Sequence, residues 1–376
     1  MRVYLDNAAT TAMAPEVIDL MSDMMKSDYA NPSSIHHGGR KSRIIIEKSR
    51  KTVANLLNTS PGNIFFTSGG TEADNMAIRC GILDNNITHA ITSSISHKAV
   101  LYPLEELREK KLISLSYIKL DDNGRIDLND LDQLLQNNPR TFVSIMHANN
   151  EIGTIQPIKE IGLLCKKYNA IFHSDTVQTM AHYAIDLQEI EVDFITGSAH
   201  KFHGPKGVGF IYIGDNIKIR PFISGGSQER NMRAGTENVH AIAGLASAME
   251  LSCSTMDEDK RYILDLKKYM VRELKNNLND ISFNAACTDY ENSLFKILSV
   301  SFPKNSSSEM LLFNLDIMGI SCSGGSACSA GHMSGSHVLD KVCKDQSRTG
   351  VRFSFSKYNT KEEIDYTIKR LVEIFN

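Results

Sequence analysis

The strongest constraint on the fold is the alternation of short β-rich runs with helical stretches over the first two thirds of the chain. The expected strands span residues 64–67, 90–92, 114–118, 141–146, 170–173 and 193–196. Between two of them, residues 158–167 place Ile158, Ile161, Leu164 and Cys165 on one helical face. Strands separated by helices predict an α/β fold with a mainly parallel sheet, which binds ligands at the carboxyl ends of its strands.

The pattern changes in the last third of the chain. A strand pair is predicted around residues 207–213, after a turn cluster at 204–207, and residues 239–274 predict a long helix that is interrupted near 252–257. Strands near 296–301 and 350–354 and a closing helix at 361–375 then predict a smaller α+β unit. We place the domain boundary near residue 255.

Composition excludes several classes of protein. The 376 residues carry 41 Lys and Arg against 44 Asp and Glu, and this balance gives no reason to expect nucleic acid or a membrane as partner. No run approaches the ~18 apolar residues of a membrane helix, and the first residues do not resemble a secretory signal. Seven scattered cysteines argue against a disulfide framework and for a reducing compartment. We therefore expect a cytoplasmic protein, and an enzyme.

A glycine-rich turn follows the first predicted strand of the sheet. Gly69, Gly70 and Thr71 stand where a helix begins, so backbone N–H groups and the Thr71 hydroxyl are suited to cradle a phosphate. An ordinary strand-to-helix turn with Thr71 as the N-cap explains the same residues.

Two further strand ends bring a carboxylate and a lysine to one edge of the sheet. Asp175 and Gln178 follow one strand, and Ser198, His200 and Lys201 follow the next. The pairing suits a pyridoxal phosphate site, where a carboxylate holds the ring nitrogen and a lysine forms the Schiff base. A plain ion pair between Asp175 and Lys201 is the equal alternative.

Three other residues stand out. His97 opens a helix after a strand, where it could stack on an aromatic ring or simply cap the helix. Arg352 alternates with apolar residues on a strand, which suits a bidentate clamp on a carboxylate or a surface ion pair.

Cys328 lies among Ser and Gly residues in the stretch 321–337, where we expect an exposed, reactive thiolate. A metal site is a minor alternative here, because the spacing of Cys322, His332, His337 and Cys343 fits no common ligand pattern.

Seven segments together resemble the cysteine desulfurases, which are class V pyridoxal-phosphate enzymes of aminotransferase fold type I, and among them the nitrogen-fixation and housekeeping iron–sulfur group. The segments span residues 4–11, 31–36, 67–72, 149–153, 198–207, 232–236 and 326–328. The resemblance implies a large cofactor-binding domain with a seven-stranded sheet at 11–255. It implies a small domain at 1–10 and 256–376 that carries the cysteine loop.

The resemblance also implies a role for each matching residue. Lys201 would be the Schiff-base lysine, His97 the ring that stacks on pyridoxal 5'-phosphate, and Cys328 the sulfur acceptor; Asn150 and Arg352 would hold the substrate carboxylate. The remaining cofactor-binding residues would be Gly70, Thr71, Asn150, Asp175, Gln178, Ser198, His200 and, from the second subunit of a homodimer, Thr236. L-Cysteine would give L-alanine and a persulfide on Cys328 for a sulfur-acceptor protein. We hypothesise that His97 is the base that helps to ionise the Cys328 thiol.

Two departures from the resemblance bear on function. Cys322 is an additional thiol, which we interpret as a spectator, with receipt of the persulfide as the alternative. Housekeeping members carry a C-terminal tail that docks the iron–sulfur scaffold, and the sequence ends at Asn376 without it. This departure bears on delivery to that scaffold and not on the desulfurase step, so the expected acceptor is an iron–sulfur scaffold or another thiol carrier. The alternative functions are a selenocysteine or cystine lyase of the same fold and a metal- or sulfur-binding protein without catalysis.

Overall fold

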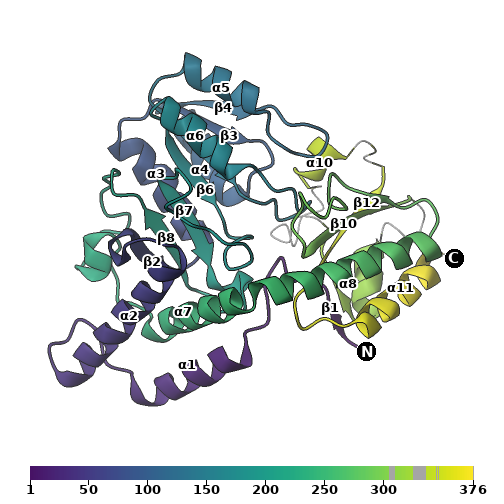
Figure 1. The fold of residues 1–376 in the computed structure, drawn as a ribbon, viewed down its shortest axis with the longest axis horizontal. Coiled ribbons are helices and arrows are strands. Elements are labelled where there is room, and N and C mark those ends of the chain that lie inside the picture. The colour runs from purple at the N-terminus through teal and green to yellow at the C-terminus, as the bar shows by residue number, and fades with distance from the viewer. Residues whose placement is uncertain (305–309, 325–335, 344, 346, 376) are drawn as a thin grey trace.

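The computed structural model describes residues 1–304, 310–324, 336–343, 345 and 347–375. A large α/β unit and a smaller α+β unit lie side by side (Figure 1). The first and last residues of the chain both lie at the smaller unit (Figure 1). In the described part of the chain, no helix has the length and the apolar composition that crossing a membrane would require.

A seven-stranded sheet forms the centre of the large unit, with the strand order β2-β8-β7-β6-β5-β3-β4. All neighbouring pairs from β7 to β4 are parallel, and β8 alone runs antiparallel to both of its neighbours. The mainly parallel sheet predicted from the sequence is therefore confirmed. The strands are β2 (Ile64–Thr67), β3 (His89–Ser93), β4 (Ser114–Ile118), β5 (Thr141–Met146), β6 (Ile171–Asp175), β7 (Phe194–Ser198) and β8 (Gly209–Ile213).

Helices cover both faces of this sheet, which is why its inner strands are apolar on both sides. Phe65 and Phe142 pack against α3 and α4 on one face, whereas Phe66 and Val143 belong to the core with α1, α2, α5, α6 and α7 on the other. The helices are α1 (Pro15–Ser27), α2 (His37–Leu56), α3 (Gly70–Asp84), α4 (Lys98–Glu109), α5 (Leu128–Asn137), α6 (Ile158–Lys167) and α7 (Val239–Ser254).

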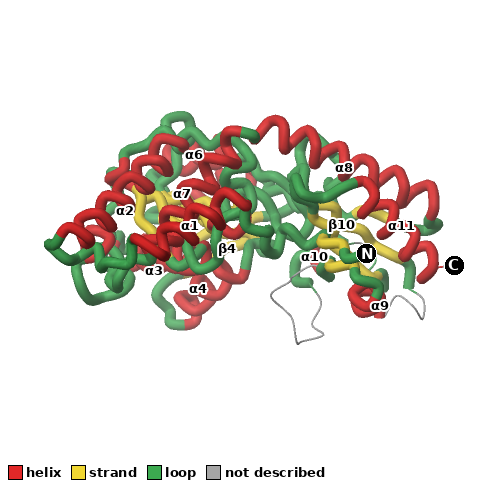
Figure 2. The backbone as a smooth tube through the Cα atoms, turned by 90° about the horizontal axis from the view of Figure 1, so that it is seen from below, coloured by secondary structure: helices red, strands yellow, loops and turns green. Residues whose placement is uncertain are grey.

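The smaller unit has its own apolar core, which contains Val3 and Leu5 from the N-terminal segment. Its strands are β1 (Val3–Tyr4), β9 (Ser282–Phe283), β10 (Ile297–Phe302), β11 (Ile320–Ser321) and β12 (Thr349–Ser354), and its helices are α8 (Met256–Asn277), α9 (Leu311–Ile317), α10 (Leu339–Val342) and α11 (Lys361–Phe375). β10 pairs with β12 and β9, and β1 pairs with β11. Figure 2 shows α8 and α11 on one side of these strands and α9 on the other. The domain boundary at residue 255 stays a prediction.

Most elements expected from the sequence are present at or near the expected positions. The helices at 158–167 and 361–375 have the expected bounds, and the expected break in the long helix separates α7 from α8 at Thr255. The strand pair expected around 207–213 is wrong, because the structure has the single strand β8 there. The five residues of β8 form only one strand. This strand pairs with β2 and β7, which both come from earlier in the chain.

Candidate active site

A cavity of about 410 Å³ lies where the carboxyl ends of the central strands meet the smaller unit. Its volume is within the usual range for sites that bind small molecules. We call it the main cavity. The residues that line it are Ala8, Ala9, Gly70, Thr71, Asp74, His97, Lys98, Met146, Asn150, Glu151, Asp175, Val177, Gln178, Ser198, His200, Lys201, His337 and Arg352. The structure thus brings together all the described residues of the expected site except Thr236.

The start of α3 forms one end of the main cavity. The first N–H groups of a helix have no partner within it, so they are free to bind an anion. Gly70 leaves no room for a side chain, since a Cβ atom there would lie 2.7 Å from Cγ2 of Val177. Ser198, at the end of β7, is buried beside this turn. The arrangement suits a phosphate group held close to the backbone.

Two buried carboxyl groups line the floor of the main cavity. Asp175 Oδ1 accepts a hydrogen bond from the Val177 N–H at 3.0 Å, and Asp74 Oδ1 accepts one from Thr196 Oγ1 at 2.8 Å. Burial raises the pKa of Asp175 to about 6, and the nearby Asp74 carboxylate adds to the effect. Burial also raises the pKa of Asp74 to about 6. A cationic ring nitrogen at Asp175 would supply the opposite charge that favours its ionised form.

Lys201 lines the same cavity as these carboxyls and contacts backbone groups of the N-terminal segment. Its Nζ donates hydrogen bonds to the carbonyl oxygens of Ala8 at 2.8 Å and Ala9 at 2.7 Å. Gln178 Nε2 donates to the same Ala8 oxygen at 3.0 Å. Gln178 Oε1 is buried and has no hydrogen-bond partner among the described residues, so it offers a polar contact to a ligand.

Two histidines that line the main cavity use their Nδ1 atoms in local contacts. His97 caps α4, with Nδ1 accepting the Ala99 N–H at 3.1 Å, so the capping role considered for it is present. His200 Nδ1 lies 3.1 Å from Thr10 Oγ1. Burial and the neighbouring Lys201 charge lower the pKa of His200 to about 4, which keeps its ring neutral at pH 7.

Arg352 is buried at the wall of the main cavity, so the alternative of a surface ion pair does not describe it. Its Nη2 lies 2.7 Å from Asp6 Oδ1, and its Nη1 donates to the Asn150 carbonyl oxygen at 2.8 Å. Arg352 Nε has no hydrogen-bond partner among the described residues. The guanidinium therefore keeps a donor for a further acceptor, such as a carboxylate.

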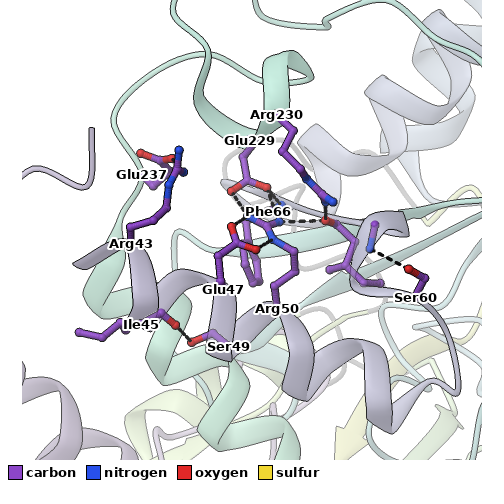
Figure 3. Close-up of polar contacts among 12 residues, drawn as sticks. Arg43, Ile45, Glu47, Ser49, Arg50, Ser60, Phe66, Glu229, Arg230 and Glu237 are labelled. Carbon is purple, nitrogen blue, oxygen red and sulfur yellow. Dashed lines mark hydrogen bonds and ion pairs between the residues drawn. The ribbon is translucent and has the colours of Figure 1, made fainter. Parts of the chain in front are cut away.

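Thr236 lies outside the main cavity and lines a second cavity of about 140 Å³, together with Ser68, Glu229 and Arg233. The preceding segment is fixed beside β2, because Glu229 accepts hydrogen bonds from Arg50 and from the Phe66 N–H (Figure 3). The turn between β2 and α3 separates the two cavities, with Ser68 in one and Gly70 in the other. The expected role of Thr236, a cofactor contact from the second subunit of a dimer, stays a prediction.

Comparisons with known proteins show the family of the chain. A family model described as aminotransferase class-V matches residues 3–367. The chain belongs to this family. Within it the chain falls in the cysteine desulfurase group: it is 42% identical to Cysteine desulfurase IscS of Dictyoglomus turgidum, covering 99% of this chain and 94% of that protein. It is 39% identical to Cysteine desulfurase IscS of Methanosarcina thermophila, covering 99% and 91%.

Solved structures show the same fold. A "NIFS-LIKE PROTEIN" is 39% identical with a TM-score of 0.91, covering 100% of this chain and 99% of that one. The structure titled "SspA in complex with cysteine" is 29% identical with a TM-score of 0.81, covering 96% and 100%. The expected class V aminotransferase of fold type I is confirmed.

The main cavity of this class-V aminotransferase fits pyridoxal 5'-phosphate. The start of α3 at Gly70 suits its phosphate, and the buried carboxyl of Asp175 suits its ring nitrogen. Lys201 lines the same cavity as Gln178, whose Oε1 has no hydrogen-bond partner in the part of the chain that the structure describes. Each part of the cofactor therefore has a chemically matched group in one cavity of sufficient volume.

The cysteine-rich segment is described only in part. Cys328 and His332 lie outside the described residues. Burial, with the Asp6 carboxylate, raises the pKa of the Cys322 thiol to about 12, which favours the spectator interpretation. No group of three or more His, Cys, Asp or Glu residues is arranged to hold a metal ion within the described part of the chain.

Sequence reasoning missed several groups of the site. Asp6 and the carbonyl groups of Ala8 and Ala9 come from the N-terminal segment, and only the tertiary path of that segment brings them here. Asp74 follows Thr71 by three positions in α3, and residues three apart lie on the same face of a helix. The sequence could therefore have predicted that Asp74 lies near the expected phosphate site. His337 was considered only as a metal ligand, and the structure places it in the wall of the main cavity.

Proposed function

We propose that this cysteine desulfurase binds pyridoxal 5'-phosphate in the main cavity and moves the sulfur of L-cysteine to Cys328, leaving L-alanine. The observation that carries the proposal is the presence of Lys201, Asp175 and Arg352 in one cavity. They supply an amine, a partner for a ring nitrogen, and a cation for the substrate carboxylate. Full-length similarity to proteins named cysteine desulfurase supports the choice of substrate.

The cofactor would be held at each end by groups of this chain. Thr71, Ser198, His200 and the start of α3 would bind the phosphate. Asp175 would pair with the ring nitrogen, Gln178 with the ring oxygen, and His97 would stack on the ring. When bound, pyridoxal phosphate withdraws electrons from the carbon attached to its imine, which weakens the bonds to that carbon.

Arg352 and Asn150 would bind and orient the substrate. Arg352 is fixed by Asp6 and by the Asn150 carbonyl group, so its remaining donors keep one direction. A fixed guanidinium binds a carboxylate with little loss of conformational entropy. This contact would direct the α-carbon of cysteine toward Lys201.

Lys201 would carry the proton of the α-carbon. The Ala8 and Ala9 carbonyl oxygens accept hydrogen bonds from its Nζ and thereby set its direction. With substrate bound, Nζ would accept the α-proton and later return a proton to the product.

Cys328 would receive the sulfur. Its thiolate attacks the substrate sulfur, so an S–S bond forms while the C–S bond breaks, and the electron pair of that bond stays with carbon. Protonation of the carbon gives L-alanine. The sum is L-cysteine and a Cys328 thiol in, and L-alanine and a Cys328 persulfide out.

The proposal includes a homodimer, a sulfur-acceptor protein and a cytoplasmic location. The match of Thr236 to a contact from a second subunit supports the dimer. A persulfide has to be passed to another thiol before the next turnover, which supports an acceptor protein. The thiol at Cys328 has to be reduced at rest, which favours a reducing compartment.

The test is to incubate the purified protein with L-cysteine, quantify alanine, and map the persulfide by mass spectrometry, with Cys328→Ser as the matched variant. We expect alanine together with a persulfide on Cys328, and loss of both in the variant. Alanine that persists in the variant would contradict the proposal and indicate a lyase. A colourless, metal-loaded protein that forms no alanine would instead indicate a binding protein without catalysis.

A further inference from the structure

Asp74 is a buried acid of the main cavity to which the proposed function gives no role. It belongs to α3, is only 1% exposed and lines the cavity together with Asp175. Burying a carboxylate costs free energy unless charges or hydrogen bonds compensate it. The contacts of Asp74 show which part of the site it serves.

The two strands beneath α3 place Asp74 beside Asp175. His173 and Asp175 are two residues apart on β6, so their side chains lie on the same face of the sheet. Thr196 of β7 is the register partner of Asp175 and shares that face. Asp74 Oδ1 accepts a hydrogen bond from Thr196 Oγ1 at 2.8 Å and lies 3.3 Å from His173 Nε2. Since neighbouring strands are about 4.8 Å apart, the carboxyls of Asp74 and Asp175 lie over the same pair of strands.

The groups around Asp74 orient its carboxyl without neutralising it. Burial lowers the pKa of His173 to about 4, so its ring is neutral at pH 7. His173 Nδ1 lies 2.8 Å from Ser144 Oγ, and Nε2 makes no hydrogen bond with the described residues and has Asp74 Oδ1 as its polar neighbour. A carboxylate only accepts, so the hydrogen of the neutral ring is expected on Nε2. His173 and the Thr196 hydroxyl can therefore hold the carboxylate in place, but they leave its negative charge.

The charge of Asp74 acts on Asp175. Burial raises the pKa of Asp175 to about 6, and the Asp74 carboxylate adds to this effect. The pKa of Asp74 is also raised to about 6, so both groups are ionised at pH 8. Two carboxylates close together attract one cation more strongly than either does alone. The other titratable groups in this part of the molecule are His97 and Lys98 at the start of α4, His173 on β6, and His200 and Lys201 after β7.

We propose that Asp74 is a positioning residue for the ring nitrogen of pyridoxal phosphate: its charge acts through Asp175 and favours the cationic form of the ring. Asp175 would contact the ring nitrogen, and Asp74 would add a second negative charge beside it. A nearby opposite charge favours the charged form of a titrating group. The ring would therefore stay protonated, and withdraw electrons, at a pH where a single carboxylate would let the proton go. The inference rests on the proposed function and deepens it.

The test measures how tightly the full-length protein, freed of cofactor, binds two ligands in equilibrium dialysis at pH 8. One ligand is pyridoxal phosphate, and the other is its carbocyclic analogue, in which a C–H group replaces the ring nitrogen. Both carry the phosphate and the aldehyde, but only the first can carry the positive charge. We expect Asp74→Asn to weaken binding of pyridoxal phosphate about 10-fold and binding of the analogue less than about twofold.

Two further variants accompany Asp74→Asn. Asp84→Asn is the matched control, because Asp84 ends the same helix, pairs with Arg220 at 2.6 Å and lies outside the main cavity. It removes one negative charge as well, and it should leave both affinities unchanged. Asp74→Ser is a second uncharged replacement of smaller size, and it should reproduce the selective loss.

The pH dependence separates charge from shape. As pH falls from 8 to 5, Asp74 of the wild type takes up a proton, so the wild type and Asp74→Asn come to carry the same charge at this position. The selective loss should therefore shrink over this range. A loss that depended on the shape of the side chain would be the same at both pH values.

An equal loss of affinity for the two ligands in both Asp74 variants would overturn the inference, because a purely structural role gives that result. An unchanged affinity for pyridoxal phosphate at pH 8, or a selective loss that is as large at pH 5, would also overturn it. Failure of the wild type to bind pyridoxal phosphate would instead overturn the proposed function on which the inference rests.

Discussion

Arg352 and Asp6 form an ion pair between the last strand and the first residues of the chain, with 2.7 Å between Nη2 and Oδ1. Arg352 is almost fully buried, whereas the Asp6 side chain is 18% exposed. The pair therefore compensates a buried charge and fixes the guanidinium at the wall of the main cavity.

Asp6→Asn should destabilise the protein by about 2 kcal/mol, because it leaves the buried Arg352 charge without its carboxylate. Ser323 Oγ donates a hydrogen bond to Asp6 Oδ1 at 2.7 Å, and asparagine retains an oxygen that can accept it. The substitution therefore removes the negative charge and keeps this hydrogen bond. Urea unfolding of the two proteins measures the difference. The matched control is Glu189→Gln, whose exposed pair with Lys159 should contribute nothing measurable. Equal effects of the two substitutions would contradict this account.

Asp74→Asn should change the pH dependence of stability in the cofactor-free protein. The pKa of Asp74 is raised from 3.8 to about 6, so the folded state holds this proton better than the unfolded state does. Wild type therefore loses stability from this group as pH rises from about 4 to about 6, and the loss persists above pH 6. Asparagine does not titrate and keeps an acceptor for Thr196.

The stability of Asp74→Asn relative to wild type should thus improve by about 1–3 kcal/mol between pH 4.5 and pH 8. Other titrating groups are common to both proteins and largely cancel in the difference. Asp175 is the exception: the Asp74 charge helps to raise its pKa, so its response changes the difference in the same direction. Thermal unfolding at the two pH values measures it. A difference that does not vary with pH would show that Asp74 keeps its ordinary pKa.

Borohydride reduction of the protein loaded with pyridoxal phosphate should label Lys201. Its Nζ lies in the main cavity, directed by the Ala8 and Ala9 carbonyl groups. Peptide mass spectrometry should find the reduced adduct on Lys201, and Lys201→Ala should lose it. Lys206 is exposed and nearby, so Lys206→Ala is the control that should keep the label. Label spread over surface lysines would argue against a specific site.

Glu229→Gln should cost about 3–5 kcal/mol, because both it and Arg50 are buried and the substitution leaves Arg50 without a full counter-charge. The amide would also set N–H donors against the guanidinium (Figure 3). Glu47→Gln is the control, since Glu47 contacts the same Arg50 but is about half exposed and should cost less than about 1 kcal/mol. Denaturant unfolding compares them, and similar losses would refute the argument from burial.

The sequence was most informative where one periodic pattern decided the structure. The helix at 158–167 follows from one apolar face, and the strands that end at Asp175 and Ser198 were expected from their order in the chain. Parallel strands end at one edge, which is why Asp175 and Lys201 were expected in one cavity. Backbone groups such as the Ala8 carbonyl carry no sequence signal, because any residue supplies one.

The position of His337 shows a second limit of sequence reasoning. Its contact with Ser96 joins residues 241 positions apart, and no local pattern encodes such a contact. The sequence presented it only as one of several residues in a cysteine- and histidine-containing stretch. Which nitrogen of a histidine is free depends on its hydrogen bonds, which only the folded chain defines.

The N-terminal segment has a consequence for the order in which the protein is made. Leu5 and Asn7 bond the backbone of Ser354, and the Ala8 and Ala9 carbonyl groups that direct Lys201 follow immediately. Residues 5–9 are thus synthesised long before β12, the strand that holds them. Until β12 exists, a growing chain can form much of its central sheet, but it lacks Arg352 and the backbone contacts that fix residues 5–7. The contacts around Lys201 are therefore completed only after β12 has been made.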